Sequence, residues 1–123
     1  MSYTTFKYNN LKVSPLKVMK NERIEVSLDI TNTGRRYGRE VVQLYVSDPA
    51  SKVARPPKEL KAFSKISLEP GETKTVNFML DKEALSFWDT ENGGWIAEPG
   101  EFEILVGSSS RDIRAKKKFE LVA

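Results

Sequence analysis

Two pairs of carboxylates come closest to a catalytic spacing in this sequence. Asp81 and Glu83 are two positions apart, and so are Asp89 and Glu91. Acid–base hydrolysis of a sugar bond needs two carboxyl groups about 5–10 Å apart across a cleft, one of them with a raised pKa. Exposed turns do not supply that environment, because water and the turn backbone solvate the carboxylates. We therefore expect all four residues to be solvated turn residues, and the chain to carry no catalytic residue.

A weak likeness to a calcium-binding loop occurs at residues 89–94. Acidic residues occupy its first and third positions and glycine its sixth. Its fifth position is Gly93, which has no ligand side chain, and Gly100 stands where a bidentate glutamate is needed. The chain also lacks cysteine and histidine, which removes thiolate and imidazole ligands. We expect a glycine-rich hairpin turn here, and neither a metal nor a cofactor bound to the chain.

Four aromatic side chains have the chemistry to stack on sugar rings: Tyr37, Phe87, Trp88 and Trp95. Trp88 and Trp95 flank a predicted hairpin, which would bring them close together. Aromatic residues of β-proteins pack mostly in cores and at sheet edges, where they bury large apolar areas. Packing is therefore the first interpretation, and sugar stacking by Trp88, Trp95 and Tyr37 is the second.

The charge distribution argues against a nucleic-acid partner. The chain has 20 Lys and Arg and 17 Asp and Glu, for a net charge of +3. Its basic residues form short clusters at 35–39 and 111–118 instead of one concentrated patch. A solvated face that protects a sheet edge explains both clusters, with a polyanion contact as the alternative.

Membrane and export signals are not expected in this sequence. Its apolar runs are shorter than the roughly 20 residues that span a membrane. The first ten residues, MSYTTFKYNN, lack the apolar core of a signal peptide. As given, the chain is expected to be cytoplasmic, whereas a longer parent could be exported.

The elements that position these residues are organised around residues 23–49. Apolar residues at every second position from 24 to 30 alternate with polar ones, which predicts a strand with one buried face. Residues 32–34 then end the strand with residues that tolerate a positive φ. A second strand is expected at 40–47. The expected core comprises Ile24, Val26, Leu28, Val42, Leu44, Val46, Val76, Phe78, Phe102, Ile104 and Val106.

Other strands surround this pair. They are expected at 3–13, 59–68, 73–80, 102–106 and 113–121, with a small hairpin over 85–96 and Pro-Gly turns at 69–72 and 98–101. Seven or eight short strands with turns about every 8–12 residues predict an all-β, immunoglobulin-like sandwich of antiparallel strands in two sheets.

Some local features are also predicted. The apolar phase of 59–68 slips, which indicates a bulge near Phe63 or Ser64. Residues 18–22 and 107–110 are expected to be connections. The last strand is expected near a sheet edge, because Lys117 occupies an inward position.

A long loop without periodicity precedes the strand at 59. Two consecutive prolines favour an extended backbone at its end, and its length suits a change of sheet. Exposed apolar groups on a long loop often mark a docking surface. The expected interface residues are Val53, Arg55, Pro56, Pro57 and Lys58. A simple solvated loop is the alternative.

Four runs in this order resemble one known domain family. They are VVQLYVSDP at 41–49, RPPKELKAF at 55–63, LEPGETKTVNFML at 68–80 and GGWIAEPGEFEILVGSSS at 93–110. Together they resemble the C-terminal fibronectin type III-like domain of family 3 glycoside hydrolases, the β-glucosidase group. The resemblance runs from about Tyr3 to Leu121. Ala62 departs from it, since the family usually has glycine there.

The resemblance implies a fibronectin type III-like sandwich and a parent enzyme whose active site lies on other domains. No residue of this chain matches the nucleophile or acid/base motif of that family. Residues 1–123 are therefore expected to form a single non-catalytic domain, with the catalytic domains of a family 3 enzyme as its partner. The alternatives are a stand-alone carbohydrate-binding module, with carbohydrate as its partner, and a generic protein-interaction sandwich.

Overall fold

The computed structural model describes residues 4–19, 22–47, 58–81, 87–89, 94–96 and 100–122. Its strands are β1 (Phe6–Ser14), β2 (Lys17–Met19), β3 (Ile24–Asn32), β4 (Gly38–Ser47), β5 (Glu59–Leu68), β6 (Thr73–Leu80), β7 (Phe87–Asp89), β8 (Gly94–Ile96), β9 (Gly100–Ser109) and β10 (Asp112–Val122).

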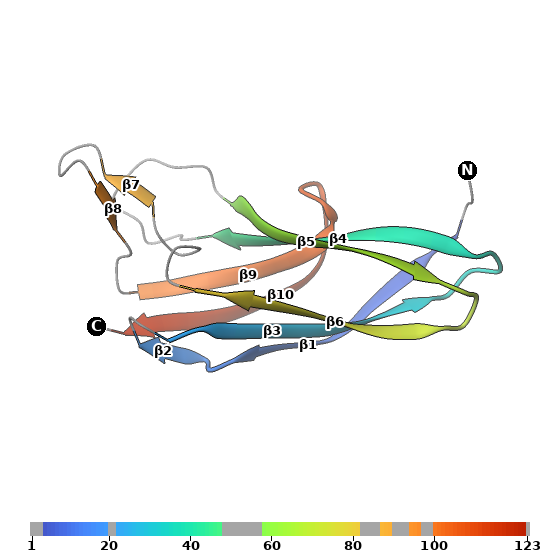
Figure 1. Ribbon diagram of the computed structural model, residues 1–123, viewed down its shortest axis with the longest axis horizontal. Coiled ribbons are helices and arrows are strands. Elements are labelled where there is room, and N and C mark those ends of the chain that lie inside the picture. The colour runs from blue at the N-terminus through green and yellow to red at the C-terminus, as the bar shows by residue number, and fades with distance from the viewer. Residues whose placement is uncertain are drawn as a thin grey trace.

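Eight of these strands form two stacked sheets (Figure 1). One sheet has the order β1-β3-β6 and the other the order β2-β10-β9-β4-β5. The short strands β7 and β8 pair as a separate hairpin at one end of the sandwich. The predicted all-β sandwich with its two sheets is confirmed. The described pairings are antiparallel, except that β2 runs parallel to β10.

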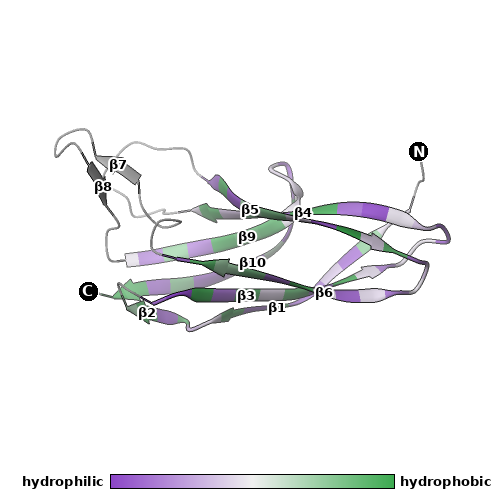
Figure 2. Cartoon of the chain, viewed as in Figure 1, coloured by the Kyte–Doolittle hydropathy of each residue, from purple (hydrophilic) through white to green (hydrophobic). Residues whose placement is uncertain are grey.

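The core lies between β3 and β4, the inner strands predicted to organise the chain. Along β3, Ile24, Val26, Leu28 and Ile30 are all buried, and polar residues alternate with them. All eleven residues of the predicted core belong to the buried cluster, together with residues such as Val18, Leu68, Phe119 and Leu121. Figure 2 shows apolar and polar segments alternating along the strands. The alternation in the sequence therefore produces a dry layer between two sheets.

The predicted turn at 69–72 is confirmed, and the first strand has an irregularity of its own. The amide of Glu72 donates to the carbonyl oxygen of Glu69 at 3.0 Å, and Gly71 has the positive φ of 79° that this turn requires. The pairing of β1 with β3 shifts between Asn9 and Lys12, where Asn10 has φ 56°.

Two of the predicted connections are strands in the structure. Residues 18 and 19, expected in a connection over 18–22, belong to β2, because Val18 is buried and the backbone pairs with residues 120–122 of β10. β2 is the sheet edge and pairs only with the end of β10, so the prediction that the last strand lies near an edge is confirmed. Residues 107–109, also expected in a connection, belong to β9 and pair with β10.

The bulge predicted in β5 near Phe63 or Ser64 is present, and it lies at Lys61, two residues before Phe63. Leu44 pairs with Ala62 while Tyr45 pairs with Leu60, so Lys61 is the extra residue. Phe63 disturbs the apolar phase for another reason: it points away from the core and is 58% exposed. The predicted helical turn after Asp81 and the second Pro-Gly turn, before Gly100, lie outside the described residues.

Candidate interaction surface

The outer face of the three-stranded sheet is mostly polar and internally hydrogen-bonded, and Met79 on β6 is its one large exposed apolar residue among those described. The hydroxyls of Thr31 and Thr73 lie 2.7 Å apart on neighbouring strands. Asp29 accepts bonds of 2.8 Å from the hydroxyl of Thr75 and from the side-chain amide of Asn10. These two bonds lower the pKa of the Asp29 carboxyl. Side chains of this kind are well solvated, so this face needs no partner.

The outer face of the five-stranded sheet carries apolar side chains. Val41, Leu60 and Phe63 are 37%, 50% and 58% exposed, and lie on the neighbouring strands β4 and β5. Tyr45 and Leu105 also alternate with core residues and point to this outer face, although both are buried. We call these five residues the outer-face patch.

The strand register makes the outer-face patch continuous. Tyr45 pairs with Leu60 on one side and with Leu105 on the other, so the three form a row across β5, β4 and β9. Phe63 pairs with Gln43, which lies between Tyr45 and Val41 along β4. The patch is therefore one surface and not a set of scattered apolar residues.

Hydrogen bonds fix the centre of the outer-face patch. The hydroxyl of Tyr45 donates to the side-chain oxygen of Gln43. The amide nitrogen of Gln43 in turn donates to the carbonyl oxygen of Ser108 at 3.0 Å. Tyr45 is thus held in place by β4 and β9 together.

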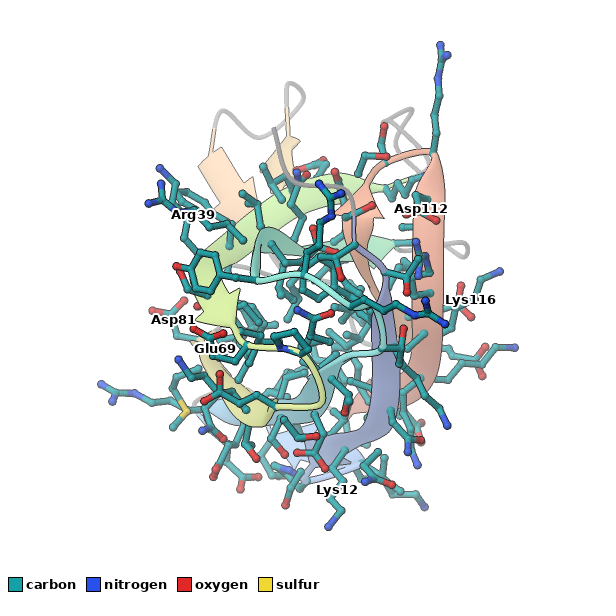
Figure 3. All side chains as sticks on the ribbon, turned by 90° about the vertical axis from the view of Figure 1, so that its right-hand side faces the viewer. Lys12, Arg39, Glu69, Asp81, Asp112 and Lys116 are labelled. Carbon is teal, nitrogen blue, oxygen red and sulfur yellow. The ribbon has the colours of Figure 1, made fainter. Side chains whose placement is uncertain are left out.

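Basic side chains border the outer-face patch. Lys65 is paired with Val41 in the register and Lys116 with Leu105, and both lysines are exposed. Arg39 is exposed on the same face of β4. On β9, the nearby Glu103 pairs in register with Lys118. Figure 3 shows Arg39 and Lys116 on the outside of the sandwich.

The interface residues predicted from sequence are mostly beyond what the structure describes. Val53, Arg55, Pro56 and Pro57 lie outside the described residues. Lys58 is half-buried and immediately precedes β5. The first residue of β5, Glu59, accepts a hydrogen bond of 3.0 Å from Lys61. The loop therefore leads into the strand that carries Leu60 and Phe63.

The predicted aromatic residues do not converge. Trp88 and Trp95 are paired across β7 and β8, which agrees with the predicted hairpin. Tyr37 belongs to the connection 33–37, which lies at the opposite end of the sandwich (Figure 1). There, hydrogen bonds with Ser67 and Arg39 lower the pKa of Tyr37. The backbone of Tyr37 is therefore far from the strand pair that carries Trp88 and Trp95.

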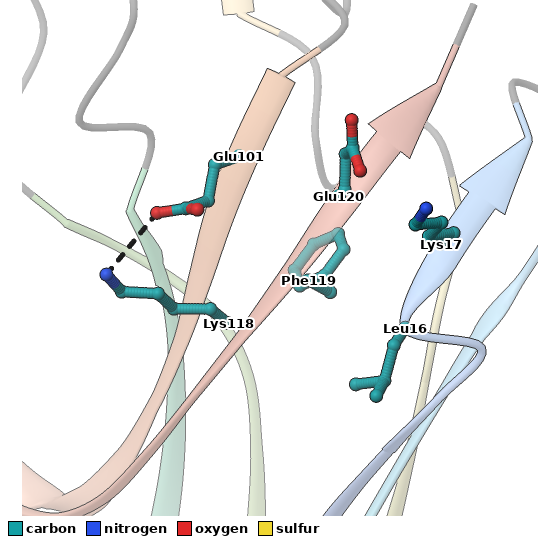
Figure 4. A pocket seen from close by; sticks show the side chains of 6 residues that line it. All are labelled: Leu16, Lys17, Glu101, Lys118, Phe119 and Glu120. Atoms are coloured by element: carbon teal, nitrogen blue, oxygen red, sulfur yellow. Dashed lines mark ion pairs between the residues drawn. The ribbon is translucent and has the colours of Figure 1, made fainter.

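A pocket of about 390 Å³ opens beside the end of β10 (Figure 4). It is lined by Leu16, Lys17, Glu101, Lys118, Phe119 and Glu120. Glu101 and Glu120 pair in register, and Lys118 lies 3.4 Å from Glu101. Both carboxylates are exposed. The pocket therefore lacks the desolvated carboxyl that hydrolysis of a sugar bond needs.

Glu40 is a half-buried carboxylate that points between the sheets. Burial raises its pKa, and the hydroxyl of Tyr8 donates to it at 3.1 Å. The Arg114 guanidinium lies 5.6 Å from the centre of the Tyr8 ring and 2.7 Å from Asp112. Bonds from Arg114 and Ser108 hold the pKa of Asp112 below its usual range.

These residues join β1, β4 and β10, and neither Glu40 nor Asp112 lines the pocket. A raised and a lowered carboxyl pKa can mark an acid–base pair, but here each carboxylate is occupied by neighbouring side chains. We interpret Tyr8, Glu40, Asp112 and Arg114 as a structural cluster that links the two sheets, and call it the clasp. Of the carboxylates predicted to be solvated, Asp81 is exposed, whereas the side chains of Glu83, Asp89 and Glu91 lie outside the description.

Neither a metal-binding cluster nor a membrane-spanning helix occurs in the described part of the chain. Among those residues, no three or more carboxylates gather to hold a metal ion. Within the same residues, no helix is long and apolar enough to cross a membrane.

The sequence reasoning missed the outer-face patch. The sequence does contain evidence for it: Val41 and Phe63 are apolar, although they occupy outward-facing positions between the core residues of their strands. The phase of Phe63 was instead attributed to a bulge. Apolar residues on both faces of β4 and β5 indicate a strand covered on both sides.

Comparison with known proteins shows that the chain is similar to segments of longer proteins. The model of the fibronectin type III-like domain family matches residues 40–110. Thermostable beta-glucosidase B of Acetivibrio thermocellus is 50% identical over 117 residues, which cover 95% of this chain and 16% of that protein. The chain thus spans about a sixth of the length of this relative.

Solved structures also match nearly all of this chain with a small part of their own length. The beta-glucosidase of Listeria innocua in complex with glucose superimposes with a TM-score of 0.91 at 36% identity, over 100% of this chain and 17% of that one. The GH3 beta-glucosidase of Bifidobacterium adolescentis gives 0.89 at 38% identity, over 98% of this chain and 18% of that one.

Proposed function

The chain belongs to the fibronectin type III-like domain family, and we propose that it is the non-catalytic accessory domain of a family 3 β-glucosidase-like enzyme. In this role it packs on the catalytic domains and stabilises them. The observation that carries the proposal is the coverage: the match extends over 95% of this chain but over only 16% of the relative. The chain therefore corresponds to one part of a larger enzyme.

The chemistry of the described residues supports a non-catalytic role. The carboxylates of the pocket are exposed, and those of the clasp are engaged by Tyr8, Arg114 and Ser108. The chain also has no histidine and no cysteine to act as base or nucleophile. A carbohydrate-binding module is the second candidate, since Trp88 pairs with Trp95 on one hairpin.

The test uses thermostable beta-glucosidase B of A. thermocellus with its matching segment replaced by this chain. This chimera is compared with the same enzyme lacking the segment, by thermal inactivation and by hydrolysis of an aryl β-glucoside. We expect the shortened enzyme to inactivate faster or to fail to fold. Equal inactivation of both would contradict the proposal.

The isolated chain is assayed in parallel. It should not hydrolyse the aryl β-glucoside and should not bind oligosaccharides. Turnover that disappears when Asp89 or Glu91 is changed to Asn or Gln, with the fold intact, would show a catalytic domain instead. Sugar binding that is lost on changing Trp88 and Trp95 to Ala would favour the carbohydrate-binding module.

A further inference from the structure

We infer that the outer-face patch is the docking surface of this domain, and that it binds an apolar, acid-rimmed surface on the remaining part of a β-glucosidase chain. The inference rests on the proposed function and names the surface and the partner chemistry that carry it out. The polar outer face of the three-stranded sheet remains in contact with water.

Exposure and position both indicate that the patch is covered in the working protein. Val41, Leu60 and Phe63 are large apolar side chains on adjacent strands, and a contiguous group of this kind marks an interaction site. β5 is also the last strand of its sheet. An exposed phenylalanine on an edge strand favours aggregation unless another surface covers it. On the opposite outer face, Met79 is exposed but has no exposed apolar neighbour among the described residues, and the surrounding polar side chains hydrogen-bond to one another.

The basic border distinguishes between partners. Arg39, Lys65 and Lys116 are exposed around the patch. A second copy bound face to face would bring these three cations and Glu103 into the interface from both sides, which leaves an excess of positive charge there, because a two-fold interface uses the same surface on both copies. A partner with carboxylates around an apolar centre would instead neutralise them. The relatives provide a large neighbour, since this chain matches only 16% of thermostable beta-glucosidase B.

The patch is also prepared for binding. Tyr45 is buried at its centre and bonded through Gln43 to the backbone of β9. Little side-chain entropy remains to be lost there on docking, which favours tight association. Leu60 and Phe63 are 50% and 58% exposed, and they supply the apolar area that docking newly buries.

The chain offers closely matched controls. Leu60 and Leu16 are both 50% exposed, and Phe63 and Met79 are both 58% exposed. The patch variant is Leu60→Ser with Phe63→Ser, and the control variant is Leu16→Ser with Met79→Ser. Both are made in the isolated chain and in the β-glucosidase B chimera. In the isolated chain we expect the two variants to unfold at similar temperatures.

In the chimera the variants should differ. We expect the patch variant to shorten the thermal-inactivation half-life toward that of the enzyme lacking the segment, by about tenfold or more, as loss of a central contact does. The control variant should keep the half-life of the chimera. Arg39→Glu with Lys65→Glu should also shorten it, whereas Lys7→Glu with Lys12→Glu on the polar face should not.

The possible failures are distinguishable. If the chimera and the shortened enzyme inactivate alike, the proposed function fails. If they differ but patch and control variants behave alike, the domain docks through another surface and the present inference is overturned. If the isolated chain forms a dimer that the patch variant abolishes, the partner is a second copy, and the assignment to the enzyme is overturned.

Discussion

The side-chain amide of Asn32 donates a hydrogen bond of 3.0 Å to the carbonyl oxygen of Leu68, and so ties the end of β3 to the end of β5 in the opposite sheet. The same amide donates to the carbonyl oxygen of Arg36 at 2.8 Å. Its oxygen accepts bonds from the hydroxyl of Thr4 at 2.6 Å and the backbone amide of Gly34 at 3.0 Å. Asn32 is fully buried, and these four bonds satisfy its side chain.

Asn32→Asp should therefore destabilise the isolated chain by about 1–3 kcal/mol or more, because a carboxylate cannot donate to the two carbonyl oxygens. Urea denaturation measures the change. The control is Asn77→Asp, since Asn77 is exposed on β6. Equal effects of the two substitutions would show that the bonds of Asn32 add nothing to stability.

Leu44→Ala tests the predicted core. Leu44 is fully buried on β4, and truncation of such a leucine costs about 2–5 kcal/mol. Val41→Ala, three residues earlier on the outer face, should cost below about 1 kcal/mol because Val41 is 37% exposed. Urea denaturation of both variants gives the comparison. A cost below about 0.5 kcal/mol for Leu44→Ala would mean that the inward phase of β4 is wrong.

The sequence predicted the fold because its strongest signals are local. Alternation from Ile24 to Ile30 and the Pro-Gly turn at 69–72 act over a few residues, and each determines one element. β2 was missed because it has only three residues and pairs with residues 120–122, about a hundred positions away. Local sequence patterns do not indicate which distant residues pair in a parallel contact of this kind.

Gly107→Ala should be among the more damaging of the glycine substitutions. A β-carbon on Gly107 would lie 2.0 Å from the carbonyl oxygen of Asp112, in the backbone of the neighbouring strand. The two strands would have to separate, which we expect to cost about 2 kcal/mol or more, as overpacking does. Gly71→Ala is the comparison, since its β-carbon meets nothing within 4 Å and only the positive φ opposes it. That change should cost about 1–2 kcal/mol. A smaller loss for Gly107→Ala by urea denaturation would show that β9 and β10 can move apart.

Glu40 predicts a pH dependence of stability. Burial raises its pKa above the usual value, so protonated Glu40 favours the folded state and this contribution is lost as pH rises through the folded pKa. Glu40→Gln keeps the shape and an acceptor for Tyr8 without the charge. We expect the variant to be more stable than the parent at pH 7, and the difference to shrink as pH falls below the usual glutamate range.

The measurement is urea denaturation of both chains from pH 3 to 8. Asp29 and Asp112 have lowered pKa values, so their contributions are lost as pH falls, and they are present in both chains. The difference between the two chains therefore reports on Glu40 and the groups that act on it, Tyr8, Arg114 and Asp112. A less stable variant at pH 7 would mean that attraction to Arg114 outweighs the cost of burial.

The candidate site was less predictable than the fold. The apolar residues of a docking surface do not pack in the core of their own domain. In the sequence they therefore look like interruptions of the apolar–polar alternation of a strand. Phe63 was assigned to a bulge for this reason. Its pairing with Gln43 shows that its side chain lies on the outer face of the sheet. The raised pKa of Glu40 was equally hidden, since it depends on Tyr8, 32 residues earlier in the chain.

The last prediction concerns the loop that leads into β5. We expect Val53 and Arg55 to contact the catalytic domains, with Arg55 and Lys58 pairing with acidic residues there. Prolines 56 and 57 restrict the backbone, so less conformational entropy is lost on docking. Replacing Val53 and Arg55 together by Ser should leave the melting temperature of the isolated chain nearly unchanged. The same change in the β-glucosidase B chimera should shorten its thermal-inactivation half-life.

A matched control for this loop variant is Met79→Ser with Lys12→Ser, which removes one exposed apolar and one exposed basic side chain from the opposite face. This control should leave the chimera unchanged. If the loop variant instead unfolds the isolated chain, as seen by its melting temperature, the loop belongs to the core of this domain. The remaining interface residues should then be sought first on the hairpin of β7 and β8, where Trp88 and Trp95 are paired.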